Sequence, residues 1–461
     1  MLAELRARLP DRVSTAKAVR LQHANALTWH APEPPDAVAY ATSIDDVVAV
    51  VRTCAAHRLP LVAFGTGTSL EGQVNAPAGG ICLDLSRMNR VLAVRPDDMD
   101  CTVEAGVTRL QLNADLRDRG LFFPVDPGAD ASLGGMAATR ASGTNAVRYG
   151  TMRENVLALT AVLADGRVIR TGGRARKSAA GYDLARLLVG SEGTLGIIVD
   201  LTLRLHGIPE AIAAARCPFR TLAGACATAI GAIQSGLPLA RVELLDEVQI
   251  RATNRHSGLD LPETPTLFVE FHGSPAGVEE QAETFRGLAE DNDLLAFDWT
   301  RDAEERSRLW KARNDAAWAS LSLRPAAKVV ATDVCVPLSR LAECVLASKA
   351  DLAARGLLGM VVGHVGDGNF HVAVLFDPAD RDESARVKGF CADLALRAIA
   401  MDGTCTGEHG IGQGKVEYLA AEFGDALDTM RDLKRALDPL GILNPGKILP
   451  PARATGLGAL S

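Results

Sequence analysis

The sequence predicts a soluble α+β protein of several domains, and three observations lead to this prediction. The 461 residues correspond to about three domains of roughly 150 residues each. Apolar residues at 48% and charged residues at 23% are ordinary for globular proteins and argue against disorder. Short apolar runs between glycine clusters fill residues 37–206, whereas strand-like and helical segments alternate over 215–320.

The N-terminal half is predicted to begin with a helical lead-in and to continue as short strands. The lead-in covers residues 1–34 and ends at a group of prolines. Apolar residues at helical spacing predict a helix over 45–57. Farther along, Asp165–Gly166 separates two strand-like runs, and this pair predicts a hairpin because glycine tolerates positive φ.

The C-terminal half is predicted to alternate between strands and helices, as in an open sheet with helices on one face. Residues 360–375 are apolar at both ends and rich in glycine in the middle. The expected strands are 215–218, 267–273 and 329–337, and the expected helices are 222–235, 278–288, 338–352, 384–400 and 425–437.

Charge and aromatic content exclude nucleic acid as an expected partner. The formal net charge is −7 and aromatic residues make up only 4% of the chain, which suits neither a phosphate backbone nor stacked bases. The longest apolar runs are too short to span a bilayer, and the N-terminus lacks a signal-peptide pattern. We therefore expect no transmembrane segment.

The nine cysteines predict free thiols in a reducing compartment. Their number is odd and no two form a Cys-x-x-Cys pair, which also argues against an iron–sulfur cluster held by thiolates. We expect a cytoplasmic location on these grounds. The sequence leaves open a peripheral association with a membrane surface and a homodimeric state.

Three glycine-rich clusters in the first half predict a cofactor that lies close to the backbone. The first, PLVAFGTGTSLEGQ at 60–73, joins an apolar strand to a turn whose backbone N–H groups can hold a pyrophosphate. A plain tight turn is the alternative for this segment taken alone. The other two clusters occupy 126–150 and 190–198, and three clusters within about 130 residues are hard to explain as unrelated turns.

Two known nucleotide-binding motifs are excluded. Neither GTGTSL at 65–70 nor GIGQG at 410–414 completes the glycine fingerprint of a nicotinamide-binding Rossmann domain. Residues 441–447 match the glycine and lysine spacing of a P-loop, but Ile448 replaces the hydroxyl residue and no helix is expected to follow.

The C-terminal half contains a candidate metal site. His364 and His371 flank glycines in GHVGDGNFH, and Glu408 and His409 follow in GEHGIG. A spacing of seven would place the two histidines on opposite faces of a continuous strand, so the glycines indicate a loop that lets them converge. Two imidazoles and a carboxylate suit a divalent transition metal, although each histidine alone is more often a hydrogen-bonded core residue.

Two basic residues are candidates for binding a substrate carboxylate. Arg313 lies on a predicted helix, where its guanidinium offers a fixed fork of donors, and the alternative is a surface ion pair. Lys328 begins the following strand and is the weaker candidate.

The order of these motifs resembles that of the FAD-linked oxidases of the vanillyl-alcohol-oxidase type. The motifs are GTGTS, ADASLGGMAATRASGTN, GSEGTLGI, GHVGDGNFH, GEHGIG and LNPGKIL, and the resemblance covers nearly all of the chain after residue 35. It implies an FAD-binding domain of two subdomains plus a cap domain of antiparallel sheet with helices. The implied parts are a helical lead-in at 1–34, the FAD-binding domain at 35–208, the substrate or cap domain at 209–410, and a segment at 411–461 that returns to the FAD-binding domain.

The resemblance also implies roles for individual residues. Thr68 occupies the place where some relatives attach the flavin to a histidine, so we expect non-covalent FAD. His364, His371 and Glu408 match positions that hold a divalent metal such as Zn²⁺ or Mn²⁺, and His409 matches the position of the catalytic base. The residues expected to bind FAD are Gly65, Thr66, Gly67, Thr68, Ser69, Asp130, Ser132, Gly135, Ser142, Gly143, Glu192, Gly193, Ile198 and Asn444.

The activity implied by the resemblance is the metal-assisted oxidation of a D-2-hydroxy acid by hydride transfer to flavin N5. D-Lactate, oxidised to pyruvate, is the first candidate, because the motifs are most similar to those of cytochrome-linked D-lactate dehydrogenases. Glycolate or another D-2-hydroxy acid is the alternative substrate, and a flavin-bearing electron-transfer subunit is the alternative without catalysis. The expected electron acceptor is a cytochrome, a quinone or an electron-transfer flavoprotein.

Overall fold

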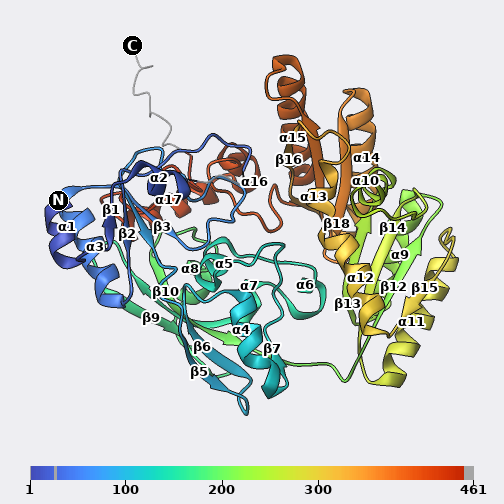
Figure 1. Ribbon diagram of the computed structural model, residues 1–461, viewed down its shortest axis with the longest axis horizontal. Helices are drawn as coiled ribbons and strands as arrows, with labels where there is room; N and C mark the ends of the chain where they lie inside the picture. Colours follow the sequence, from blue (N-terminus) through green and yellow to red (C-terminus); the bar gives the residue numbers. More distant parts are fainter. Residues whose placement is uncertain (1, 25–27, 451–461) are drawn as a thin grey trace.

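The computed structural model describes residues 2–24 and 28–450, apart from the side chain of residue 317, and contains two lobes. The first, blue to green in Figure 1, holds the N-terminal half together with the red C-terminal segment, and the second holds the green-to-orange middle of the chain. Arg241 of the second lobe donates to Asn145 of the first across their contact. The last residues of the predicted segment 411–461 lie outside the described part.

A four-stranded sheet begins the first lobe, in the order β1-β2-β4-β3. Strands β2, β4 and β3 are parallel, and β1 is antiparallel to β2. The predicted helix over 45–57 is confirmed as α3 (Ile44–His57), which Ser43 caps by accepting from the Asp46 amide. The strands are β1 (Val13–Ser14), β2 (Ala37–Tyr40), β3 (Leu61–Phe64) and β4 (Ile81–Asp84).

The lead-in differs from the prediction because it contains a strand as well as helices. Helices α1 (Leu2–Arg8) and α2 (Lys17–Gln22) flank β1, which pairs with β2. This pairing is between distant segments, so helical spacing within the lead-in could not reveal it.

A five-stranded antiparallel sheet completes the first lobe, in the order β5-β6-β10-β8-β9. The predicted hairpin is confirmed, since Val162 pairs with Val168 across Asp165–Gly166 and Gly166 has φ +80°. A two-stranded sheet lies beside it. The strands are β5 (Val91–Arg95), β6 (Asp100–Glu104), β8 (Val156–Val162), β9 (Val168–Gly172) and β10 (Ile197–Arg204), with β7 (Leu121–Phe122) and β11 (His206–Gly207) forming the pair.

The second lobe is built on an eight-stranded antiparallel sheet in the order β15-β12-β14-β13-β18-β19-β16, with β17 also paired to β19. Helices cover it (Figure 1), and their apolar faces form one core with the sheet. The strands are β12 (Ala211–Pro218), β13 (Leu239–Leu245), β14 (Thr266–Gly273), β15 (Asp298–Thr300), β16 (Lys328–Ala331), β17 (Val334–Cys335), β18 (Leu358–His364) and β19 (Asn369–Phe376).

The predicted strand over 329–337 is interrupted at Thr332 and Asp333. Both flanking parts pair with β19. Between them, the Val372 amide donates to the Thr332 hydroxyl, and the Thr332 carbonyl accepts from the His371 ring at 3.0 Å. The ladder is broken because these groups bind side chains, which a reading of apolar residues cannot detect.

The helices predicted in the C-terminal half are found, with bounds that differ by a few residues, and further helices such as α10 were not predicted. Among the described residues, no helix is both long and apolar enough to cross a bilayer. The remaining helices are α4 (Arg109–Leu116), α5 (Leu133–Thr139), α6 (Ala146–Tyr149), α7 (Met152–Asn155), α8 (Leu184–Leu188), α9 (Leu222–Gln234), α10 (Glu247–Ser257), α11 (Pro275–Glu290), α12 (Ala303–Asn314), α13 (Ala316–Ser320), α14 (Leu341–Ala354), α15 (Arg381–Ala400), α16 (Leu419–Phe423) and α17 (Ala426–Leu437).

The C-terminal segment packs against the first sheet. The Leu61 amide donates to the Ile442 carbonyl, and the Asn444 amide donates to the Leu61 carbonyl, each at 2.8 Å. Residues 442–444 therefore extend the edge of the sheet at β3, the strand that precedes the first glycine-rich loop.

Candidate active site

The first glycine-rich loop, residues 65–69, follows the end of β3 and lies against the second cluster. A Cβ at Gly65 would collide with the Ser132 hydroxyl, so the loop can pass this close only with glycine. The hydroxyl oxygens of Ser132 and Ser191 are buried without a hydrogen-bond partner in the described chain. Buried hydroxyls normally have partners, so these two indicate a polar ligand beside the loops.

The third cluster is tied to the C-terminal segment. The Asn444 side chain donates to the carbonyls of Gln73 and Glu192, at 3.1 and 2.7 Å, and its own oxygen is buried without a partner in the described chain. Gly193 lies next to Ala63 at the end of β3. These contacts bring the glycine clusters and Asn444 together, and the partnerless polar atoms of Ser132, Ser191 and Asn444 suit a polar ligand such as FAD.

The carboxylates of Glu192 and Asp130 accept hydrogen bonds from backbone amides. The Glu192 carboxylate accepts from the Ile411 and Gly412 amides at 2.7 and 2.9 Å, and burial raises its pKa to about 7. Asp130 is exposed and accepts from the Leu110 amide. The partners of Glu192 are therefore loop amides, and the partner of Asp130 is an amide in helix α4.

The other residues expected to bind FAD lie near the loops but differ in burial. Ser142 is buried, and Ile198 lies inside β10. Gly143 packs against Asp126, and Gly135 lies next to the Ser132 hydroxyl.

The predicted metal ligands converge. His364 ends β18 and His371 lies in β19, and the hairpin register places both on one face of the sheet, with ring centroids 5.4 Å apart. Glu408 Oε1 lies 3.2 Å from Nε2 of each histidine. The Glu408 Oε2 atom is buried and has no partner among the residues described.

Further acceptors fix the orientation of both imidazoles. The Nδ1 atom of His364 lies 2.7 Å from Glu243 Oε1, and that of His371 lies 3.0 Å from the Thr332 carbonyl. Since both partners accept hydrogen bonds, Nδ1 of each ring carries a proton, and Nε2, which faces Glu408, is the nitrogen left to bind a metal. This is the arrangement that metal-ligating histidines adopt, so the donor set fits a divalent metal.

A second grouping, formed by Asp333, His371 and His409, is a poorer metal site. Asp333 already accepts from four groups, and the buried Lys415 ammonium lies 3.5 Å from it. Burial would raise the Asp333 pKa, but the positive charge of Lys415 and the hydrogen bond from the His409 amide hold it well below its usual range. Its donors are the Asn369 side chain, the Thr406 hydroxyl and the amides of Glu408 and His409.

His409 lies beside the metal ligands, with its imidazole half-buried. Its ring stacks on His371, with centroids 4.9 Å apart and an interplanar angle of 8°. Burial and the nearby His371 charge lower the His409 pKa, which favours the neutral ring. Its Nδ1 atom has no partner in the described chain, and its carbonyl accepts from Gln73 in the first loop. The residue can therefore take up a proton.

The structure brings Arg313 to this cluster but not Lys328. Arg313 donates through Nε and Nη2 to Glu243, at 2.9 and 2.6 Å. Lys328 is exposed and pairs with Phe376, five residues along β19 from His371, which is about 16 Å along the strand.

Three site residues were not predicted from the sequence: Glu243, Asp333 and Lys415. Glu243 and Asp333 each interrupt an apolar strand, LARVELL and VVATDVCV. A charged residue inside a buried strand requires a charged or hydrogen-bonding partner, and this signal could have identified both of them.

Comparison with known proteins establishes the family. Residues 208–448 match the family of FAD linked oxidases, C-terminal domain, and residues 35–172 match an FAD binding domain. The chain belongs to the FAD-linked oxidases. The probable mitochondrial D-lactate dehydrogenase of Danio rerio is 53% identical over 95% of this chain and 89% of that protein.

More distant FAD-linked oxidases also match over most of their length. The mitochondrial D-lactate dehydrogenase [cytochrome] of Arabidopsis thaliana is 46% identical over 98% of this chain and 80% of that protein. Glycolate oxidase subunit GlcD of Bacillus subtilis is 33% identical, over 95% and 94% respectively. The predicted resemblance is therefore confirmed.

Solved structures share the fold of this FAD-linked oxidase. A p-cresol methylhydroxylase with bound substrate has a TM-score of 0.79 at 18% identity, covering 97% of this chain and 96% of that one. The 4-ethylphenol oxidase of Gulosibacter chungangensis has a TM-score of 0.78 at 19% identity, with the same coverage. The predicted fold, an FAD-binding domain with a cap of antiparallel sheet and helices, is confirmed.

The expected cytoplasmic location is wrong for this FAD-linked oxidase. The matching D-lactate dehydrogenases of Danio rerio, Arabidopsis thaliana and Saccharomyces cerevisiae are all named mitochondrial. The expectation depended on free thiols, which indicate a reducing environment but do not distinguish one reducing compartment from another.

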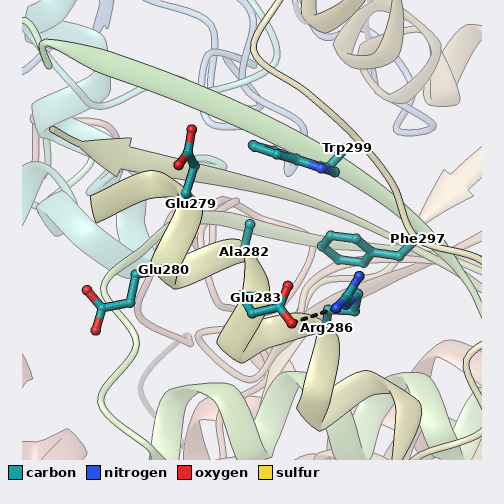
Figure 2. A pocket seen from close by; sticks show the side chains of 7 residues that line it. All are labelled: Glu279, Glu280, Ala282, Glu283, Arg286, Phe297 and Trp299. Atoms are coloured by element: carbon teal, nitrogen blue, oxygen red, sulfur yellow. Dashed lines mark hydrogen bonds and ion pairs between the residues drawn. The ribbon is translucent and has the colours of Figure 1, made fainter. Parts of the chain in front are cut away.

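A surface pocket on the second lobe of the FAD-linked oxidase lies away from this site. It is formed by α11 and β15, where Figure 2 shows Glu283 paired with Arg286 beside Phe297 and Trp299. Strand β15 lies four strands from β18, about 19 Å across the sheet. The pocket therefore has no part in the cluster around His364.

Proposed function

We propose that this FAD-linked oxidase is a metal-assisted D-2-hydroxy-acid dehydrogenase that oxidises D-lactate to pyruvate. The observation that carries the proposal is the convergence of His364, His371 and Glu408 next to the imidazole of His409 and the guanidinium of Arg313. The names of the relatives from Danio rerio and Arabidopsis thaliana support D-lactate as the substrate.

The proposed FAD site consists of the three glycine clusters and Asn444, with FAD bound non-covalently because Thr68 stands where a histidine would attach it. When bound, FAD supplies the electron sink that accepts the hydride from C2 of the substrate. The loop at 65–69 and the partnerless hydroxyls of Ser132 and Ser191 would hold its phosphates and sugar groups.

The proposed metal site uses Nε2 of His364 and His371 and the Glu408 carboxylate. A divalent metal such as Zn²⁺ or Mn²⁺ supplies Lewis acidity toward the hydroxyl and carboxylate oxygens of a 2-hydroxy acid. Glu243 and the Thr332 carbonyl keep the two imidazoles in the orientation that ligation requires.

Side chains of the protein carry out the proton transfer and bind the substrate carboxylate. His409 takes the hydroxyl proton, since its lowered pKa keeps the ring neutral. Arg313 binds the substrate carboxylate and so fixes the direction of the C2–H bond. Both side chains are only partly buried, with 14% exposure for His409 and 11% for Arg313, so a substrate can reach them while few waters compete for these contacts.

We infer that the electrons pass on to a cytochrome, as the names of the Arabidopsis thaliana and Saccharomyces cerevisiae relatives indicate for those proteins. We also propose that residues 209–410 form the substrate-binding unit and that residues 411–450 belong with the FAD-binding part. Glycolate is the second candidate substrate, because the Bacillus subtilis glycolate oxidase subunit is also related.

Anaerobic flavin bleaching tests the proposed function. The purified yellow protein is mixed with D-lactate, L-lactate, glycolate and D-2-hydroxybutyrate, before and after metal is removed with a chelator. We expect D-lactate to bleach the flavin fastest, chelation to slow bleaching, and added Mn²⁺ or Zn²⁺ to restore it. Faster bleaching by glycolate would favour the second substrate, and an undiminished rate without metal would refute the metal step.

A further inference from the structure

Glu243 occupies a central place between the elements of the candidate site. It lies in β13, and its side chain is fully buried, with 0% exposure. Strand β13 pairs with β18, so Glu243 is close to His364 at the end of β18. Helix α12 brings Arg313 to the same carboxylate.

The two carboxylate oxygens of Glu243 have separate partners. Oε1 accepts from His364 Nδ1 at 2.7 Å, and Oε2 accepts from Arg313 Nε and Nη2 at 2.9 and 2.6 Å. One buried side chain thus contacts the expected metal ligand and the expected carboxylate-binding residue at once.

Each contact fixes a property that the proposed reaction needs. Because Glu243 accepts from Nδ1 of His364, Nε2 is the nitrogen that faces Glu408 and is left for the metal. The bonds through Nε and Nη2 fix the plane of the Arg313 guanidinium, and the Nη1 donors, which have no hydrogen-bond partner among the described residues, can meet a substrate carboxylate.

We propose that Glu243 is a positioning residue that links the metal site to the substrate-carboxylate site. This inference rests on the proposed function. It predicts that one substitution at a residue that touches neither metal nor substrate weakens the binding of both.

Glutamine is the informative substitution at this position because it has nearly the same shape but only one accepting oxygen. If the amide nitrogen of E243Q faces His364, two donors oppose each other, and the ring escapes by moving its proton to Nε2, where it blocks ligation. If the amide nitrogen faces Arg313, the guanidinium loses its acceptor and its fixed plane. Neither orientation satisfies both partners.

The experiment uses the FAD-loaded protein, stripped of metal with a chelator. Mn²⁺ binding is measured by calorimetry without substrate, and the D-lactate concentration for half-maximal flavin reduction is measured at saturating Mn²⁺. For E243Q we expect Mn²⁺ to bind roughly 10–100-fold more weakly, as for other partners of metal-ligating histidines. We expect the half-saturating D-lactate concentration to rise roughly tenfold, while FAD content stays unchanged.

Glu270 provides a matched control on the neighbouring strand β14. It is also a buried carboxylate with a histidine and an arginine beside it, His272 at 2.8 Å and Arg241 at 3.6 Å, but it contacts none of the expected metal ligands. E270Q therefore removes the same charge from the same sheet. We expect its Mn²⁺ affinity and D-lactate saturation to stay within about threefold of wild type.

The outcomes separate this inference from the proposed function. Wild-type protein that binds neither Mn²⁺ nor Zn²⁺ would refute the metal site itself and this link with it. Metal binding and D-lactate saturation in E243Q equal to wild type would overturn the role of Glu243 alone. If E243Q fails to retain FAD, the E243D variant is measured instead. Its shorter side chain should still weaken Mn²⁺ binding, and unchanged Mn²⁺ binding would overturn the proposal.

Discussion

His371 shows how much of the candidate chemistry depends on the surroundings of one side chain. Its Nδ1 donates to the Thr332 carbonyl, its Nε2 faces Glu408, and its ring stacks on His409. A histidine free to rotate would present either nitrogen to a metal. Here the Thr332 carbonyl accepts from Nδ1, which fixes the orientation of the ring. Nε2 is therefore the nitrogen available to a metal, even in the metal-free protein.

The residue with the clearest expected effect on the reaction is His409. We expect H409N to slow flavin reduction by D-lactate roughly 10²–10⁴-fold, because the proton acceptor is lost. FAD content should not change, since the imidazole makes no hydrogen bond to the glycine loops in the described part of the chain. Rapid mixing under anaerobic conditions measures the rate, and flavin reduction as fast as in wild type would refute the role.

At the scale of elements, the segment 404–412 is held from both lobes. Asp333 accepts from the amides of Glu408 and His409, while Glu192 accepts from the two amides of Ile411 and Gly412. A loop without regular structure needs such acceptors to keep one conformation. The position of the metal ligand and the base therefore depends on carboxylates in two other segments.

Replacing Asp333 tests this dependence. We expect D333N to lower the free energy of unfolding by about 3–5 kcal/mol, since the buried Lys415 loses a charged partner and several donors lose an acceptor. Metal content and flavin reduction should fall with it. T406V removes only one of the donors and should cost about 1 kcal/mol. Equal stability of D333N and wild type in thermal unfolding would contradict the assignment.

Helix α3 carries a pH-dependent contribution to stability at its first turn. Asp46 accepts from the Thr42 amide at 2.9 Å and from Arg12, which is in the lead-in. Although burial opposes it, the bonds from Arg12 and Thr42 lower the Asp46 pKa from 3.8 to about 2. The stabilisation is therefore complete above pH 4 and is lost as the pH falls toward 2.

We expect D46N to lower the free energy of unfolding by about 2 kcal/mol at neutral pH. The difference from wild type should shrink as the pH falls from 4 to 2, when the wild-type carboxylate is also protonated. Chemical denaturation at a series of pH values measures it. D45N removes a charge from the exposed neighbour in the same turn and should cost much less; an equal cost would contradict the prediction.

At the scale of the whole molecule, all nine cysteines are free, as predicted, and seven of them are buried. Burial raises the pKa of each thiol, for example to about 12 at Cys54 and about 11 at Cys344. Few thiolates therefore exist near neutral pH, and thiolates are the reactive form.

We expect the native protein to react slowly with an aromatic disulfide reagent at pH 8, over hours. All nine thiols should react within minutes after unfolding in guanidinium, because burial then no longer suppresses ionisation. The visible absorbance of the product that the reagent releases gives the number of thiols that have reacted. If a thiol of the native, active protein is labelled within minutes, the prediction that burial keeps all nine thiols unreactive is contradicted.

The sequence by itself determined the family, the fold class and most of the candidate site. Glycine clusters and the order of His364, His371, Glu408 and His409 are local signals, since each depends on residue types at short spacing. The helix at α3 and the hairpin at Gly166 are equally local, because caps and turns are set by neighbouring residues.

Only the tertiary structure determined which charged side chains lie in contact with one another. It placed Glu243 between Arg313 and His364, directed Glu192 to the segment at 411–412, and left Lys328 exposed at the far end of its strand. A buried carboxylate must find its partner through space, and for Glu243 that partner is 70 or 121 residues away in the chain. No spacing within a short stretch of sequence carries that information, because it is created when the sheet assembles.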